Sequence, residues 1–273
     1  VEFQETPFNY IQWRAMDIAG NGYTTSPSYR VSTDTTPLVF IEFSPPEDEW
    51  QNSSRVECWV TVWDRLGGSG ADLATIEYRS YPQGEEGPAW QSVGLTGTMT
   101  RCRFSVVMVL DDGHHVVEFR GFDVVGNGPW VSPAYNVSVD TTPPRILFVS
   151  PPSDEIQPGR DVDVEAEFHE DISTLAVLGL EWRWRADGVD EWSMWHNIAV
   201  PEGETEVHSI ISLHLVPGRN NSIQLRCTDV VGNTVLTDPY LVWVNSPPKA
   251  WISSPANGSV VQEGEALHLS AKG

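Results

Sequence analysis

The chain has 273 residues, and its 38 Asp and Glu against 16 Lys and Arg give a formal net charge of −22. A polyanion of this kind repels nucleic acid, which is therefore excluded as a partner. Hydrophobic residues make up 40% of the chain, the share expected of a globular protein that buries a core. No apolar run approaches the ~20 residues of a membrane helix, and residues 1–5 lack the basic and apolar regions of a signal peptide. We therefore expect folded domains without a membrane span.

Short alternating stretches rich in Val, Thr, Trp and Tyr, separated by Pro, Gly and Asn, predict an all-β fold. Between residues 37 and 142, the predicted strands cover 38–43, 55–63, 73–81, 89–93, 100–110, 115–122 and 130–139. These seven short strands are typical of a β-sandwich.

Alternation assigns the faces of these strands, because successive strand residues point to opposite sides of a sheet. On the second strand, Val56, Cys58 and Val60 share the face predicted to form the core. Trp59 and Trp63 alternate with them and are predicted to face outward. Exposed tryptophans can stack on a ligand such as a glycan, so both are candidate ligand-stacking residues.

Two motifs recur at a fixed spacing. The pattern Arg-x-x-Asp-x-x-Gly-Asn returns every 106 residues, at 14–21, 120–127 and 226–233. The pattern Val-Ser-x-Asp-Thr-Thr-Pro occupies 31–37 and 137–143, and a degenerate copy without the Asp lies at 243–248. A period of this length is that of a whole domain, not of a solenoid repeat, so the motifs predict a tandem array.

The motifs also predict the domain boundaries. Residues 37–142 and 143–246 are expected to be complete repeats, 1–36 the C-terminal part of a repeat and 247–273 the N-terminal part of another. We therefore expect this chain to be a segment of a longer protein.

Together with the loop Asp-Arg-Leu-Gly-Gly-Ser-Gly at 64–70, these motifs resemble the immunoglobulin-like or fibronectin type III-like tandem repeats of bacterial and archaeal cell-surface proteins and adhesins. The resemblance implies tandem immunoglobulin-like β-sandwich domains at the cell surface, outside the cell. It further implies a non-catalytic structural or spacer segment; the sequence leaves open whether the protein forms a filament or layer. The expected partners are other domains of the same surface protein or neighbouring copies. An adhesive or glycan-binding module, or the accessory region of a secreted hydrolase, is the alternative.

Catalysis is not expected from the sequence. It contains no His-Glu-x-x-His pattern, nucleophile elbow or phosphate-binding loop, so no catalytic residue is assigned and no cofactor is required.

The Asp of the first motif allows two interpretations. In the simpler one, Asp17, Asp123 and Asp229 accept backbone N–H bonds in a turn whose Gly or Asn adopts a positive φ. In the other, the last hairpin turn of a sandwich lies beside the incoming linker. Asp34 should then lie near Asp123 and near Asp64 or Asp72.

The same argument places Asp140 near Asp229 and near Glu170 or Asp171. Converging carboxylates repel one another, and a hard cation such as Ca²⁺ holds them together. In related repeats, the resemblance implies, calcium between domains stiffens the array. The candidate ligands are Asp34, Asp64, Asp123, Asp140, Asp171 and Asp229.

Three cysteines are too few for a disulfide framework. Cys58 and Cys102 lie on core faces of strands expected to be neighbours, so they form either a cross-strand disulfide or two buried thiols. Cys227 is predicted to be a packed thiol. Four Asn-x-Ser sequences are candidate glycosylation sites of an exterior glycoprotein, at Asn52, Asn136, Asn220 and Asn257.

Overall fold

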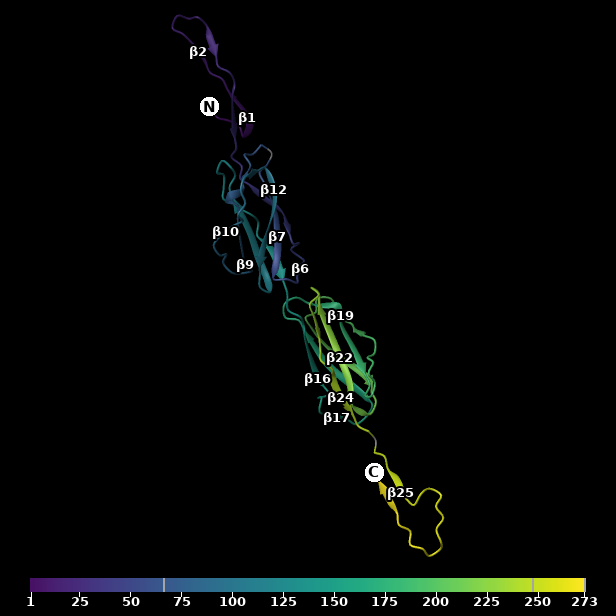
Figure 1. Cartoon of the computed structure of the whole chain (residues 1–273). Helices are drawn as coiled ribbons and strands as arrows, with labels where there is room; N and C mark the ends of the chain where they lie inside the picture. Colours follow the sequence, from purple (N-terminus) through teal and green to yellow (C-terminus); the bar gives the residue numbers. More distant parts are fainter. Residues whose placement is uncertain (66, 247, 273) are drawn as a thin grey trace. The chain divides into compact units, whose positions relative to one another are not determined.

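The computed structural model describes residues 1–65, 67–246 and 248–272, which form β-strands and a single short 3₁₀ turn (Figure 1). The chain divides into two compact units. The first unit comprises Val1–Thr142 with Val231–Asn233, and the second comprises Pro143–Val230 with Thr234–Gly273. Within the described ranges, no helix is long and apolar enough to cross a lipid bilayer.

The first unit contains a sandwich of two sheets, which are antiparallel except for the edge strand β6. One sheet has the order β12-β7-β5 and the other the order β10-β9-β13-β15-β6. The strand bounds are β5 Val39–Ser44, β6 Trp50–Gln51, β7 Arg55–Trp63, β8 Ala71–Asp72, β9 Glu77–Pro82, β10 Gln91–Ser92, β11 Thr98–Met99, β12 Arg101–Val109, β13 Gly113–Gly121, β14 Trp130–Val131 and β15 Tyr135–Val139. β6 runs parallel to β15, and β14 pairs with β13.

The core of this sandwich follows the predicted alternation. Val56, Cys58 and Val60 on β7 are buried, as is Phe119 on β13. The rings of Phe40, Phe43 and Phe104 pack around Phe119 with centroids 5.7–6.4 Å away. The predicted assignment of the core face is therefore confirmed.

Two predicted strands of this sandwich differ in detail. The strand predicted at 73–81 begins with the 3₁₀ turn Leu73–Thr75, because the Asp72 carboxylate accepts a hydrogen bond from Ala74 N–H and caps the turn. The strand predicted at 130–139 is divided into β14 and β15 around Pro133, which has no N–H to give to a ladder.

The second unit repeats this architecture. Its sheets have the orders β16-β18-β21 and β17-β24-β22-β19-β20, and β23 pairs with β22. The strand bounds are β16 Arg145–Ser150, β17 Ile156–Gln157, β18 Asp161–His169, β19 Leu175–Arg185, β20 His196–Ile198, β21 Glu206–His214, β22 Gly218–Asp229, β23 Thr234–Leu236 and β24 Tyr240–Val244. Cys227 is buried in its core, as predicted for a packed thiol.

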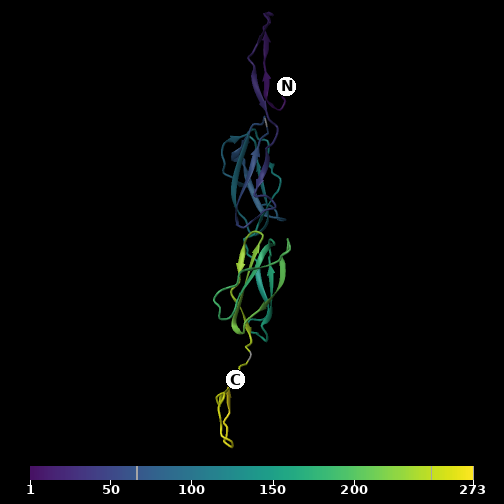
Figure 2. The same ribbon diagram turned by 90° about the vertical axis from the view of Figure 1, so that its right-hand side faces the viewer.

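The chain also forms two terminal hairpins. β1 Thr6–Ile11 pairs with β4 Tyr29–Thr33, β2 Arg14–Met16 with β3 Tyr23–Thr25, and β25 Trp251–Ser254 with β26 Ser270–Lys272. In both views these purple and yellow segments carry no second layer of described strands (Figure 2). Trp13 is accordingly 75% exposed, whereas Phe119, 106 residues later, is 1% exposed inside a sandwich.

The expected pairing of the strands that carry Cys58 and Cys102 is confirmed, but their register does not allow a disulfide. Cys58 lies opposite Val106, and Cys102 lies opposite Val62. This offset of four residues separates the two cysteines by about 13 Å along the strands, well beyond the reach of a disulfide. Both thiols are free, and burial raises the pKa of the Cys58 thiol to about 12.

Candidate cation site

Three carboxylates of the first unit converge at one end of its sandwich. Asp34 follows β4, Asp64 follows β7 and Asp123 follows β13. Each offers one carboxylate oxygen, and these oxygens lie within 4.8 Å of one another. Asp64 is fully buried, Asp123 is 2% exposed and Asp34 is half-buried. The structure therefore brings together the first set of residues that the sequence singles out.

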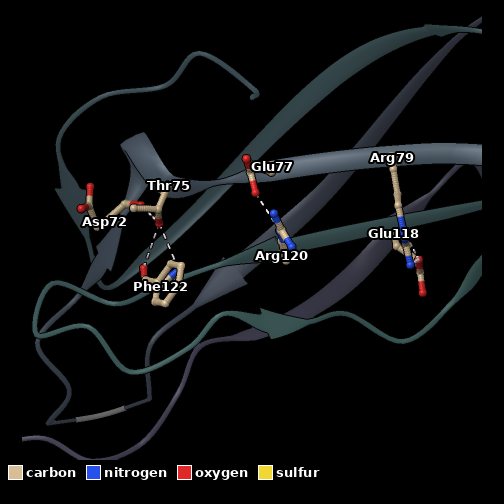
Figure 3. A network of polar contacts seen from close by, with 7 residues as sticks. All are labelled: Asp72, Thr75, Glu77, Arg79, Glu118, Arg120 and Phe122. Atoms are coloured by element: carbon tan, nitrogen blue, oxygen red, sulfur yellow. Dashed lines mark hydrogen bonds and ion pairs between the residues drawn. The ribbon is translucent and has the colours of Figure 1, made fainter. Parts of the chain in front are cut away.

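Backbone hydrogen bonds hold the loop after β7 against the end of β13. Val124 N–H donates to Gly70 O (2.8 Å), and Asp72 N–H donates to Phe122 O (3.1 Å). Phe122 N–H also donates to the Thr75 hydroxyl oxygen at 3.0 Å, as seen in Figure 3. These contacts fix the backbone on both sides of Asp123 and attach it to residues 70–75 of the loop.

The Asp of the first two hairpin motifs has the turn geometry expected from the sequence. Asp123 accepts hydrogen bonds from the N–H of Asn127 (2.7 Å) and from its side-chain amide (2.6 Å). Asp17 accepts the same pair from Asn21, and Gly20 and Gly126 have positive φ. Asp123 therefore satisfies both interpretations of the motif: it accepts the hydrogen bonds of the turn, and it lies beside the other two carboxylates.

Asp34 is fixed by both neighbouring segments. Its carboxylate accepts hydrogen bonds from the N–H of Ser69 (2.6 Å) and of Thr36 (3.2 Å), and its carbonyl accepts the Asn127 side-chain amide. Burial alone would raise the pKa of Asp34, but the hydrogen bonds from Ser69 and Thr36 outweigh it and lower the pKa below its ordinary value. Asp34 therefore stays ionised among its neighbours.

Asp64 has the least satisfied carboxylate of the three. One oxygen accepts the Gly70 N–H at 2.5 Å, whereas Oδ1 is buried and has no hydrogen-bond partner among the described residues. Burial raises the pKa of Asp64, the Gly70 bond opposes this rise, and the charges of Asp34 and Asp123 add to it. A buried anionic oxygen without a partner is costly, and a positive group beside it would relieve this cost.

Gly68 leaves room for this carboxylate. A Cβ added at Gly68 would overlap the carboxylate of Asp64, so only glycine fits here without displacing it. The set consists of oxygen donors alone, without Cys or His, which suits Ca²⁺ better than a soft transition metal. Asp72, the alternative to Asp64, instead caps the 3₁₀ turn.

In the second unit the two alternatives for a ligand, Glu170 and the predicted Asp171, differ in burial. Asp171 is exposed and forms a 2.7 Å ion pair with Arg145. Glu170 is buried and accepts the N–H of Ile172. Asp140 and Asp229, the other two candidates, are buried as well. The repeat could have indicated Glu170, because it lies 106 residues after Asp64.

Trp59 and Trp63 are less open than a stacking platform requires. Both are half-buried, and the guanidinium of Arg103 lies 3.9 Å from the ring centroid of Trp59. The guanidinium of Arg101 lies 6.0 Å from the ring centroid of Trp63. An arginine therefore already lies over each indole.

The other sheet carries arginine–tryptophan stacks that were not predicted from the sequence. The guanidinium carbons of Arg79 and Arg120 lie 4.4 and 4.5 Å from the ring centroid of Trp90. Ion pairs join these arginines to Glu118 and Glu77 across β9 and β13 (Figure 3). In the second unit, one arginine contacts two indoles: the guanidinium of Arg183 lies 4.7 and 4.5 Å from the ring centroids of Trp192 and Trp195. Alternating Arg and Glu on paired strands could have indicated the ion pairs.

The four candidate glycosylation sites have different surroundings. Asn52 and Asn257 are exposed in loops, whereas Asn136 is half-buried within β15. Asn220 is exposed, but its side-chain amide donates to the carboxylate of Asp187 at 3.3 Å. Glycosylation at these positions stays a prediction.

Comparison with known proteins finds no matching family model and no matching curated protein. Similar solved structures include fibronectin(III)-like modules of Clostridium thermocellum CbhA, with 13% identity over 76% of this chain and 94% of that chain (TM-score 0.29). A tetra-tandem repeat in the extending region of a large adhesion protein has 15% identity over 88% of this chain and 56% of that chain (TM-score 0.34). The chicken CNTN1 FN1–FN3 domains have 14% identity over 81% of this chain and 69% of that chain (TM-score 0.29).

These likenesses concern the fold alone. The strand order of each sandwich, with a three-stranded sheet packed on a larger one, is the arrangement of immunoglobulin-like and fibronectin type III-like modules. The predicted fold class, an all-β chain of tandem sandwiches, is confirmed.

Proposed function

We propose that this chain is a non-catalytic structural segment of an extracellular cell-surface protein, in which tandem sandwiches space and present other parts of the molecule. The tandem fold supports this role, as do the adhesion-protein and fibronectin-like modules among the similar structures. The non-catalytic assignment is based on the sequence, which contains none of the catalytic motifs considered above. The expected partners are neighbouring domains or copies.

We further propose that Ca²⁺ binds Asp34, Asp64 and Asp123 and thereby fixes the linker to the first sandwich. The buried Oδ1 of Asp64, which has no protein partner among the described residues, carries this proposal. A cation there would supply the missing positive charge and neutralise the repulsion between the three carboxylates. The 106-residue repeat places Asp140, Glu170 and Asp229 at the corresponding positions, and the same role is proposed for them from the sequence.

Calorimetric titration with CaCl₂ tests the site directly. The wild-type chain should bind Ca²⁺, and Asp34→Asn should lose one binding event, because Asp34 supplies a carboxylate from the linker. Asp111→Asn, which removes an exposed carboxylate at another turn, is the matched control and should bind as the wild type does. Absence of binding to the wild type, or an unchanged titration of Asp34→Asn, would refute the site.

Solution scattering tests the mechanical role. With Ca²⁺ bound, the linker should be held against the sandwich, so chelation should broaden the distribution of interatomic distances obtained from scattering. The circular dichroism spectrum should stay that of folded β-sheets. Identical profiles with and without chelator would leave binding without a stiffening role. A glycan-binding function receives no support from Trp59 and Trp63, whose rings lie under arginines.

A further inference from the structure

The outward faces of the two three-stranded sheets carry unlike charges, although the sheets occupy the same place in each repeat. The first-unit outer face is defined by the β7 and β12 residues that point away from the core. They are Arg55, Glu57, Trp59, Thr61, Trp63, Arg101, Arg103, Ser105, Val107 and Val109. The second-unit outer face is defined by the equivalent residues of β18 and β21. They are Asp161, Asp163, Glu165, Glu167, His169, Glu206, His208, Ile210, Ser212 and His214.

The first-unit outer face is locally basic on a strongly acidic chain. Arg101 and Arg103 are more than half exposed, and Arg55 is exposed as well. Against these three arginines stand Glu57 and, from β5, Glu42, which pairs with Arg101 at 2.8 Å and with Arg103 at 3.8 Å. The face therefore keeps a surplus positive charge.

The second-unit outer face is acidic along its whole length. Every alternate residue of β18 from Asp161 to Glu167 is a carboxylate, and β21 adds Glu206. Among the described residues of β16, β18 and β21, Arg145 is the one arginine, and it pairs with Asp171. Three histidines of the face lie beside carboxylates, among them His214, whose Nδ1 is 2.7 Å from Asp161. At neutral pH, this face carries a surplus of several negative charges.

Both faces also expose apolar side chains that a partner could cover. Val107 and Val109 are 51% and 70% exposed on the first face. Ile210 and, on the adjacent β16, Leu147 are 57% and 59% exposed on the second. Each face therefore combines charge with an apolar contact surface.

We propose that the first-unit outer face of one copy docks on the second-unit outer face of another copy of this chain. Charge complementarity selects this pairing, because two acidic faces repel each other and two basic faces gain no opposite charge. The contact is heterologous, so a docked pair of copies still has one free face of each kind. Association is then open-ended and places chains beside one another.

The size of the faces makes this a weak contact. Strands of nine residues are about 30 Å long, and three strands are about 14 Å wide, so each face covers roughly 400 Å². Burial of about 800 Å² in total lies below the ~1,200 Å² of stable interfaces. We expect the copies to associate only at protein concentrations of about 0.1 to 1 mM, as for a transient contact.

Sedimentation velocity at rising concentration, in 150 mM NaCl with chelator present, tests the proposal on the intact chain. The wild-type weight-average mass should rise above the 30.3 kDa monomer. Arg101→Glu/Arg103→Glu should remain monomeric. Glu165→Lys/Glu167→Lys should also remain monomeric, although it lowers the net negative charge and so the general repulsion between chains.

An equimolar mixture of the two variants gives the decisive result. The reversed faces are complementary to each other, and each variant retains one unaltered face, so the mixture should regain the wild-type rise in mass. Glu85→Lys/Glu86→Lys and Arg14→Glu/Arg30→Glu make the same charge changes at exposed positions elsewhere and should behave as the wild type does. A wild type that stays at the monomer mass, a mixture that regains nothing, or controls that lose association equally would overturn the proposal.

Discussion

Replacing Asp64 by Asn should raise the stability of the first unit without calcium and abolish its stabilisation by calcium. The Asn side chain keeps the shape of Asp. Its carbonyl oxygen can accept the Gly70 N–H, and its amide can donate to the carboxylates of Asp34 and Asp123. The variant therefore removes a buried charge and supplies donors where the wild type has an oxygen without a partner.

The magnitude follows from the spacing of the carboxylates. At the 4.8 Å limit, each pair of ionised carboxylates repels by about 3 kcal/mol at an effective dielectric constant near 20. Relaxation and partial protonation relieve much of this, so we expect a gain of about 1 to 3 kcal/mol in chelator. For a domain of this size, 1 kcal/mol corresponds to about 4–8 °C in Tm. Calcium at 100 times its Kd should stabilise the wild type by about 2.7 kcal/mol and the variant by much less.

Differential scanning calorimetry in chelator and in calcium is the appropriate assay. The transition of the first unit should move upward on substitution in chelator, and only the wild type should move upward on adding calcium. Asp111→Asn, at an exposed turn, should leave both measurements unchanged. A lower Tm of Asp64→Asn in chelator, or an equal calcium response in both proteins, would show that the carboxylates neither repel nor share a cation.

Three further results are expected. Burial alone would raise the pKa of Asp112, but hydrogen bonds from the linker threonines lower it, so its stabilisation is complete above pH ~4 and is lost in acid. Asp112→Asn should remove the part of the free energy of unfolding that is lost in acid, which is less than about 1 kcal/mol because the group is exposed. Equal urea midpoints for the wild type and Asp112→Asn from pH 2 to 5 would contradict this. An aromatic disulfide reagent should label Cys102 first. It should label Cys58 and Cys227 only on unfolding, because both are buried and burial raises their pKa values to about 12. Equal labelling rates for the three thiols in the folded protein would refute this. Phe119→Ala should cost about 3–5 kcal/mol in urea unfolding, and a loss under about 1 kcal/mol would contradict its packing.

The strand pattern predicted the core because alternation depends only on the local backbone, but it could not predict the cysteine register. β7 and β12 are neighbours in the sheet without being consecutive in the chain, so no hairpin turn sets their alignment. A slip of two or four residues keeps every side chain on its face and changes only its cross-strand partner. Cys58 and Cys102 could therefore be assigned to one face, while the distance between them needed the structure.

The candidate site was predictable to the extent that the repeat specifies position. The motifs identify Asp34 and Asp123, and the loop after the second strand supplies Asp64. The argument from the linker left Glu170 and Asp171 open and Asp171 was named as the ligand, although Glu170 repeats the position of Asp64. The buried oxygen of Asp64 and the fit of Gly68 against its carboxylate arise from loop packing, on which a single sequence carries no signal.

Net charge is a poor guide to how copies of this chain meet. The value of −22 predicts mutual repulsion, yet at physiological ionic strength the Debye length is only about 8 Å. The electrostatic energy of two faces in contact depends mainly on charges within that distance. The arginines of β12 and the carboxylates of β18 therefore contribute more to it than the charged residues of distant loops. Strand alternation gathers these residues on single faces, because every second residue points the same way. The same period of two that buries the core therefore also sorts the surface charge into one basic and one acidic face.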